Sequence, residues 1–175
     1  MLLALTAASR ACTIHCLDLR FMAKHAHFVK FRFSKLHKGW RTNKSSPEVK
    51  YYSFPLDQDI CVTSTLESYI ERSRQWRGSK TQLLLSHIKP HKEVSSSTVS
   101  RWLKDTIALA GIDTNVFKGH SSRSAASAGA GLAGASISDI LTMGSWSNES
   151  TWQKFYNKPV ISPEESFQSK LLTRK

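Results

Sequence analysis

Three stretches near the C-terminal end of the chain carry most of the information about its fold: VFKGHSSRSA at residues 116–125, DILTMGSWS at 139–147 and STWQKFYNKP at 150–159. In the first stretch, His120 and Arg123 are three positions apart, so a helix would place both side chains on one face. The same spacing fits an ordinary pair of surface residues at the start of a helix. Trp146 and Tyr156, taken singly, fit packed aromatic side chains equally well. The order in which these residues occur is therefore more informative than any one of them.

Around these stretches, the spacing of apolar residues predicts a mostly helical chain. Residues 120–134 are rich in Ala, Gly and Ser, which favours a helix of small residues that packs closely against its neighbours. Gly78 and Gly111 are placed to end two of the longer helices. We expect helices over residues 1–19, 63–77, 120–134, 137–143 and 151–156. A further helix should start at one of the serines 95–97 and run to residue 110.

A small antiparallel sheet is expected beside these helices. Residues 27–34 alternate between apolar and polar side chains with period two, which predicts a strand, and residues 49–54 predict the returning strand of a hairpin. Residues 35–47 form the polar connection, and the apolar run 82–86 is a possible third strand. The expected fold class is α+β, in one domain without internal repeats.

The charge of the chain is unevenly distributed. The 175 residues include 25 Lys and Arg against 13 Asp and Glu, a net charge of +12. Residues 20–50 contain nine of these cations and one acid, and aromatic residues are interleaved with them. This pattern predicts a hairpin that contacts phosphates, with nucleic acid as the first partner, although a solvated basic loop also fits. A membrane-binding amphipathic helix is disfavoured, because the basic segment alternates with the period of a strand.

Several other classes of protein do not fit the sequence. No apolar run is long enough for a transmembrane helix, and the odd number of three cysteines argues against a disulfide scaffold. Nucleotide-binding glycine motifs and the HExxH zinc motif are absent, and the acidic residues are scattered singly. Five Cys and His residues could be grouped as metal ligands, but Cys12 and Cys16 lie on an apolar face of the predicted helix. No metal and no cofactor is therefore expected. Those five are Cys12, His15, Cys16, His25 and His27.

The three C-terminal stretches, together with LLALTAASR at residues 2–10, resemble the catalytic domain of the tyrosine recombinases, the phage-integrase family. The branch found in eukaryotic retroelements and Crypton-like transposons is the most similar. The resemblance covers residues 1–159 as a catalytic domain and leaves 160–175 as a C-terminal tail. It implies metal-independent DNA cleavage and rejoining through a 3′-phosphotyrosine intermediate, in recombination or integration of a transposable element.

The resemblance also implies a role for each motif residue. Arg10 and Arg123 match the two arginines that clamp the phosphate, His120 the proton acceptor, and Tyr156 the nucleophile. Trp146 stands where the family has His or Trp. The hairpin lysine that protonates the leaving oxygen is Lys38 by first choice and Lys35 by second. Further DNA contacts are expected from the cations Lys35, Arg41, Lys44, Arg32 and Lys118.

The sequence departs from the family pattern at three points. Tyr156 follows Trp146 by ten positions, one more than is common, and Phe155 occupies the usual place. Thr13 stands where many members carry an acid. The chain starts at the first motif helix, so we expect the N-terminal DNA-clamp domain to be missing.

The expected partner is double-stranded DNA, with self-association on it, and the expected location is a eukaryotic nucleus. Two other functions remain open on the sequence. One is a non-catalytic DNA-binding remnant or co-opted module, and the other is a type IB topoisomerase.

Overall fold

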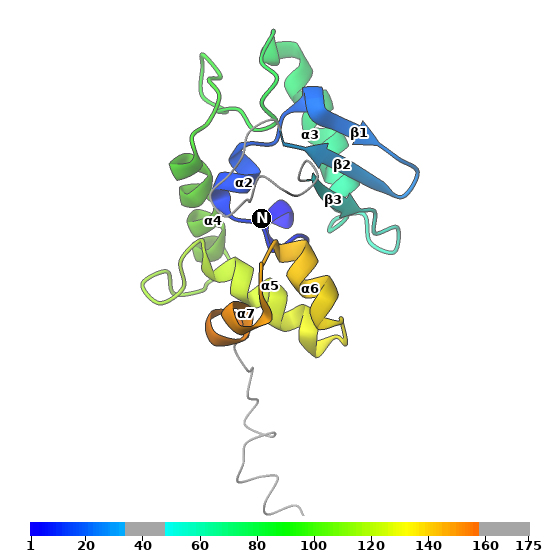
Figure 1. The fold of residues 1–175 in the computed structure, drawn as a ribbon. Coiled ribbons are helices and arrows are strands. Elements are labelled where there is room, and N and C mark those ends of the chain that lie inside the picture. The colour runs from blue at the N-terminus through cyan, green and yellow to red at the C-terminus, as the bar shows by residue number, and fades with distance from the viewer. Residues whose placement is uncertain (34–47, 158–175) are drawn as a thin grey trace, which may run out of the picture.

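The computed structural model describes residues 1–33 and 48–157. Over these ranges the chain is mostly helical, with one antiparallel sheet of three strands in the order β1-β2-β3. In Figure 1 the sheet lies at one edge with α3 behind it, and α5, α6 and α7 form the opposite end of the molecule. The predicted α+β fold class is confirmed. No helix in the described ranges is long and apolar enough to cross a membrane.

The sheet is formed by β1 (Met22–Lys24), β2 (Phe28–Arg32) and β3 (Glu48–Tyr52). Strands β2 and β3 pair in register from Phe28 opposite Tyr52 to Arg32 opposite Glu48. Alternate side chains enter the core, where Phe31 and Tyr51 are fully buried. The two strands of the hairpin are therefore confirmed, while its predicted connection, with Lys35, Lys38, Arg41 and Lys44, lies outside the described residues.

The sheet has a third strand, but it is β1 and not residues 82–86, which the sequence had offered as a possible third strand. Residues 82–86 instead run beside α2 and form isolated bridges, Gln82 with Asp18 and Leu85 with Glu93. Leu83 and Leu85 are buried, and the Leu83 N–H donates to the carbonyl of Leu17 at 2.7 Å. The apolar run 82–86 therefore indicates burial in the core and not pairing in the sheet.

The single helix expected over residues 1–19 is two short helices, α1 (Leu2–Leu5) and α2 (Ala11–His15), followed by a 3₁₀ turn at Leu19–Phe21. Ala8 has a φ of 42°, in the left-handed region that interrupts a helix. The apolar pattern still predicted burial correctly, since Ala4, Ile14 and Leu17 lie in the core. What the pattern could not show is that the backbone at Ala8 turns toward α5.

Two longer helices support the sheet and the N-terminal segment. Helix α3 (Val62–Arg77) contacts β3 and ends at Gly78, whose φ is 58°. Helix α4 (Ser96–Leu109) packs against α2 and begins with the Ser95 hydroxyl, which accepts a hydrogen bond from the Thr98 N–H at 3.2 Å. Both helices agree with the prediction to within one residue.

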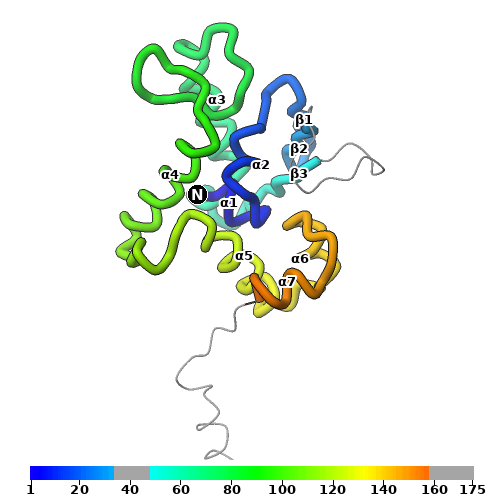
Figure 2. The backbone as a smooth tube through the Cα atoms, turned by 60° about the vertical axis from the view of Figure 1, so that its left-hand side comes forward, coloured from blue at the N-terminus to red at the C-terminus, as the bar shows by residue number. Residues whose placement is uncertain are grey.

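The C-terminal end of the described chain contains α5 (Ser121–Leu132), α6 (Ile137–Gly144) and α7 (Glu149–Phe155). Helix α7 begins two residues before the predicted start, because the side chain of Asn148 accepts a hydrogen bond from the Thr151 N–H at 2.9 Å. It ends at Phe155, so Tyr156 follows the last helical residue. Trp146 and Trp152 form a second small core with Ala8 and Ile140. The backbone trace in Figure 2 shows α5, α6 and α7 grouped below α1 and α2.

Candidate active site

Tyr156 contacts two of the residues predicted to act with it. Its hydroxyl lies 3.2 Å from Nε2 of His120. Its ring packs edge-on against Trp146, with 4.9 Å between ring centroids. Its backbone N–H donates to the carbonyl of Trp152 at 2.8 Å, which continues the helical hydrogen bonding past the end of α7. The phenol is therefore half-buried and held next to an imidazole.

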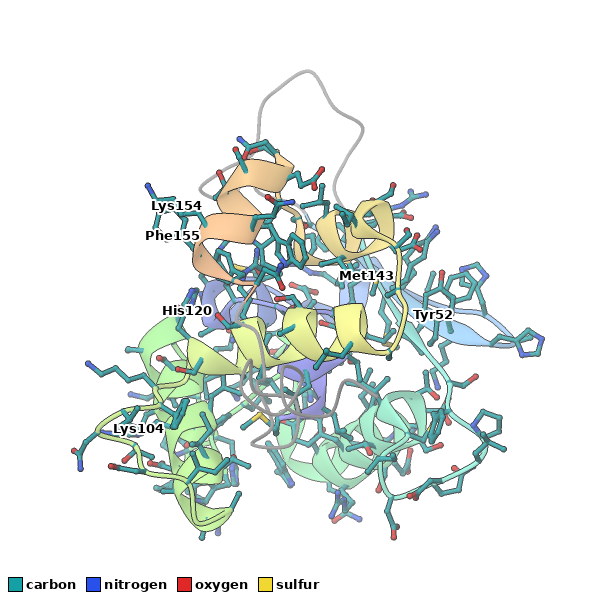
Figure 3. All side chains as sticks on the ribbon, turned by 90° about the horizontal axis from the view of Figure 1, so that it is seen from below. Tyr52, Lys104, His120, Met143, Lys154 and Phe155 are labelled. Atoms are coloured by element: carbon teal, nitrogen blue, oxygen red, sulfur yellow. The ribbon has the colours of Figure 1, made fainter. Side chains whose placement is uncertain are left out.

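Phe155, which has the more common family spacing from Trp146, lies elsewhere. Its side chain is 54% exposed, and its ring contacts the ammonium group of Lys154. Figure 3 shows Lys154 and Phe155 on the outer side of α7 and His120 at the near end of α5. The end of α7 at Phe155 is what turns Tyr156, and not its neighbour, toward His120.

Arg123 connects three separate segments from inside the protein. The residue is only 2% exposed. Its Nη1 donates to the carbonyl of Ala8 and its Nη2 to the carbonyl of Gly144. Its guanidinium carbon lies 3.8 Å from the centre of the Trp146 ring. Burial, followed by the charge of Arg10, lowers the pKa of Arg123 to about 10, so the guanidinium keeps its charge at neutral pH.

Arg10 stands at the start of α2 with an extended backbone, φ −78° and ψ 152°. The side chain is half-buried and lines the same cleft as Arg123. Three causes lower the pKa of His120 below its ordinary value. Burial is the largest, followed by the charge of Arg123 and then by the charge of Arg10. His120 is consequently neutral at pH 7 and, in the tautomer with a bare Nε2, can accept the proton of Tyr156.

A cleft of about 420 Å³ opens beside these residues, between β3, the start of α2 and the turn from α6 to α7. Arg10 and Arg123 line it together with Lys50 of β3. Hydroxyl groups of the α6–α7 turn and of α7 line the other side, from Ser145, Ser147 and Thr151. Thr13, at the position where the family often has an acid, also lines the cleft. Two carboxylates, Glu48 and Asp139, also line the cleft, and Glu48 pairs with Lys50 at 3.4 Å, so the groups that could hold an anion there are Arg10 and Arg123.

Two buried N–H groups at this site have no hydrogen-bond partner within the described part of the chain. They are Nε of Arg123 and Nε1 of Trp146. Buried donors are rarely left unpaired, because each costs about 1–3 kcal/mol of desolvation. Both belong to residues that line the cleft.

The other predicted residues fall into two groups. Arg32 ends β2 and Lys118 precedes His120, and both are exposed. The hairpin cations Lys35, Lys38, Arg41 and Lys44 lie outside the described residues, so the choice between Lys38 and Lys35 stays a prediction. Over the ranges that the structure describes, no three His, Cys, Asp or Glu residues come together as a metal site.

Sequence reasoning missed the backbone positions on which the site depends. Ala8 and Gly144 supply the carbonyls that hold Arg123, and Ser145 turns the chain with a φ of 54°. A Cβ on Gly144 would lie 1.7 Å from a ring carbon of Trp146. The signal in the sequence for this contact was Gly144, two positions before Trp146, which fits the end of the helix predicted over residues 137–143.

Among solved structures, the chain is similar to the crystal structure of XerA recombinase, with a TM-score of 0.67 and 18% sequence identity. The match covers 91% of this chain and 52% of that one. The chain has a recombinase fold. No family model matches the sequence, and no curated protein is significantly similar to it. The chain thus spans about half the length of the recombinase that it resembles in fold.

Proposed function

We propose that this chain cleaves and rejoins DNA strands through Tyr156. The observation that carries the proposal is the contact of Tyr156 with His120 and Trp146, next to Arg123. Arg123 and Trp146 line a cleft together with Arg10. These side chains come from four places in the sequence: residue 10, residues 120–123, residue 146 and residue 156. The two guanidinium side chains that line the cleft, Arg10 and Arg123, support an anionic ligand at this place.

The proposed step is an attack of the Tyr156 oxygen on a DNA phosphorus atom. The phenol proton passes to Nε2 of His120, which is neutral because its pKa is lowered. The bond from phosphorus to the 5′-oxygen breaks, and that oxygen takes up a proton, for which Lys38 or Lys35 is the proposed donor. The DNA is then joined to Tyr156 by a 3′-phosphotyrosine link. Attack by a 5′-hydroxyl reverses the sequence and rejoins a strand.

Stabilisation of charge in the transition state falls to the two arginines. The phosphate oxygens gain negative charge as the tyrosine attacks, and a guanidinium can neutralise it without a metal ion. Arg123 lines the cleft, and its charge is retained at neutral pH. Arg10 approaches the cleft from the start of α2.

The finer part of the proposal concerns biological context. The order of the motifs supports recombination or integration of a mobile element of the Crypton-like branch, on double-stranded DNA and in a eukaryotic nucleus. Self-association on DNA and dependence on a separate DNA-clamp domain belong to the same proposal. The fold similarity to XerA recombinase supports its general part.

A nicked suicide duplex tests the chemistry. Cleavage near the nick releases a short strand that diffuses away, so the covalent protein–DNA product accumulates and is seen on a denaturing gel. We expect this product from the parent and from Phe155→Leu, because Phe155 is exposed and away from His120. Tyr156→Phe should form none. An equal yield from Tyr156→Phe, or no product from the parent joined to a clamp domain, would overturn the proposal.

A second candidate function is a non-catalytic DNA-binding module. Thr13 in place of the family's acid favours it, because the carboxylate that orients an arginine is absent there. This function gives salt-sensitive duplex binding without a covalent product. Relaxation of a supercoiled plasmid by the monomer would instead indicate a type IB topoisomerase.

A further inference from the structure

A second basic segment follows the hairpin in the sequence. Residues 72–92 contain six Lys and Arg residues and no Asp or Glu. They form the last turns of α3 and the connection toward α4. Figures 1 and 2 agree that this connection lies at the end of the molecule opposite α6 and α7.

Two of the six cations already have partners in the protein. Arg77 is buried and donates to the carbonyls of Gln82 and Leu83 at 2.6 and 2.9 Å. Arg74 forms an ion pair with Glu71 at 2.8 Å. The other four have no ion-pair partner among the residues that the structure describes: Arg72, Lys80, Lys89 and Lys92. Glu71 and Glu93 flank the segment, which with them still keeps an excess of positive charge.

The loop that carries Lys89 and Lys92 is held in shape by contacts at its base. The N–H of Ser86 donates to the carbonyl of Lys92 at 2.8 Å, and Nδ1 of His91 donates to the carbonyl of Ser86 at 3.0 Å. The ring of His91 packs on Trp76, with 4.5 Å between centroids. Lys89 and Lys92 remain exposed. The two ammonium groups are thus presented from an ordered loop, which lowers the entropy cost of a contact.

The aromatic rings of this surface pack on each other, which bears on the kind of ligand. Single-stranded nucleic acid binds by stacking its bases on exposed aromatic rings. Trp76 and His91 are both partly buried and stacked together, so they brace the loop. His87 is the one exposed aromatic ring of the 86–93 loop, beside two exposed lysines. Lysine side chains suit the phosphates of a duplex, which they contact as point charges.

We propose that the 86–93 loop, together with the end of α3, binds the phosphate backbone of double-stranded DNA away from the cleavage site. The inference rests on the proposed function in taking DNA as the partner. Lys89 and Lys92 would contribute to the affinity for DNA. They would take no part in strand cleavage, since both lie at the end of the molecule away from Tyr156. One duplex that crosses the cleft and continues along the protein would reach both places.

The salt dependence of duplex binding tests this contact. Each phosphate contact contributes about 0.9 to the slope of log affinity against log salt. Replacing both lysines, Lys89→Gln with Lys92→Gln, should lower the slope by about 1.8. When the salt concentration rises four-fold, the factor by which the affinity falls should therefore be about 12 times smaller for the double variant than for the parent. At low salt the double variant should bind the duplex more weakly than the parent. A duplex of about 30 base pairs, or about three helical turns, is long enough to extend past the cleft.

A matched control removes the same net charge from two exposed cations of α4, Arg101 and Lys104, which lie outside the 86–93 loop and α3. The variant Arg101→Gln with Lys104→Gln should keep the parent's slope. Equal slopes for the two double variants would overturn the inference, as would a parent that does not bind the duplex.

The covalent product on the suicide duplex separates this inference from the proposed function. At saturating DNA, Lys89→Gln with Lys92→Gln should form the product at the parent's level. A reduced slope without any product from the parent supports the phosphate contact and rejects catalysis. A product from the parent with an unchanged slope in the loop variant supports catalysis and rejects the contact.

Discussion

Replacing Gly144 with alanine tests the packing that holds Arg123 against Trp146. A Cβ at this position would lie 1.7, 2.2 and 2.6 Å from three carbon atoms of the Trp146 ring. These distances are far below van der Waals contact, so the indole must leave its site. Trp146 is 8% exposed and covers the guanidinium of Arg123 at 3.8 Å. One methyl group should therefore displace the whole ring.

The expected loss of stability follows from two opposing effects. Displacement of a buried tryptophan costs up to about 3–5 kcal/mol, by analogy with truncation of large core residues. Alanine in place of glycine in a helix returns up to about 1 kcal/mol. The free energy of unfolding should fall by about 2–4 kcal/mol, which lowers the midpoint of thermal unfolding by about 4–16 °C for a chain of this size.

Thermal unfolding followed by circular dichroism measures this effect, with Gly129→Ala as the matched control. Gly129 lies inside α5, and a Cβ there would meet nothing within 4 Å. The control should be as stable as the parent or up to about 1 kcal/mol more stable. If Gly144→Ala behaves like Gly129→Ala, the proposed packing is refuted.

A double-mutant cycle separates the clash from a general effect of the substitution. In a background of Trp146→Ala, the ring that the new methyl group would meet is gone. Gly144→Ala should then cost nothing, and the two substitutions should be strongly non-additive. Additive losses would contradict the reasoning.

Three further predictions concern single contacts. Arg10→Gln should raise the pKa of His120, because a cation that disfavours the imidazolium is removed, and an NMR titration checks this. In the parent, formation of the covalent product should fall as the pH drops through that lowered pKa, since a protonated imidazole accepts no proton. Asn148→Ala should destabilise the protein by about 1 kcal/mol in urea unfolding, through loss of the cap on α7. Arg77→Met should cost about 2–4 kcal/mol by leaving two carbonyls without donors, whereas exposed Arg74→Met should cost less than about 1 kcal/mol.

The elements that local signals specify were predicted well. Helix α3 ends at Gly78 because glycine tolerates the positive φ found there, and α4 starts at Ser95 because its hydroxyl accepts from a free helix N–H. The hairpin strands follow from the alternation of apolar side chains around Phe31. Each of these signals acts over a few residues, so a sequence carries it without knowledge of the rest of the chain.

The elements that depend on distant residues were predicted less well. The apolar positions of residues 1–19 fit one helix, but the Ala8 carbonyl turns to meet Arg123, far along the chain. The run 82–86 is buried beside Leu17 instead of joining the sheet. Burial shows in composition, whereas the identity of the neighbour depends on topology.

The candidate site likewise has some features that the sequence indicates and others that only the tertiary structure decides. The sequence alone was enough to indicate which side chains have the chemistry for phosphoryl transfer, since their types and order are written in the chain: Arg10, His120, Arg123, Trp146 and Tyr156. The choice of Tyr156 over Phe155 also came from the sequence, because phenylalanine has no hydroxyl, and the tertiary structure shows how the end of α7 places the Tyr156 ring next to His120. Only the tertiary structure decided that Ala8 and Gly144 hold Arg123 through their carbonyls. The physical reason is that every residue has the same backbone carbonyl, so the residue types in a sequence do not indicate which carbonyl accepts from a buried guanidinium.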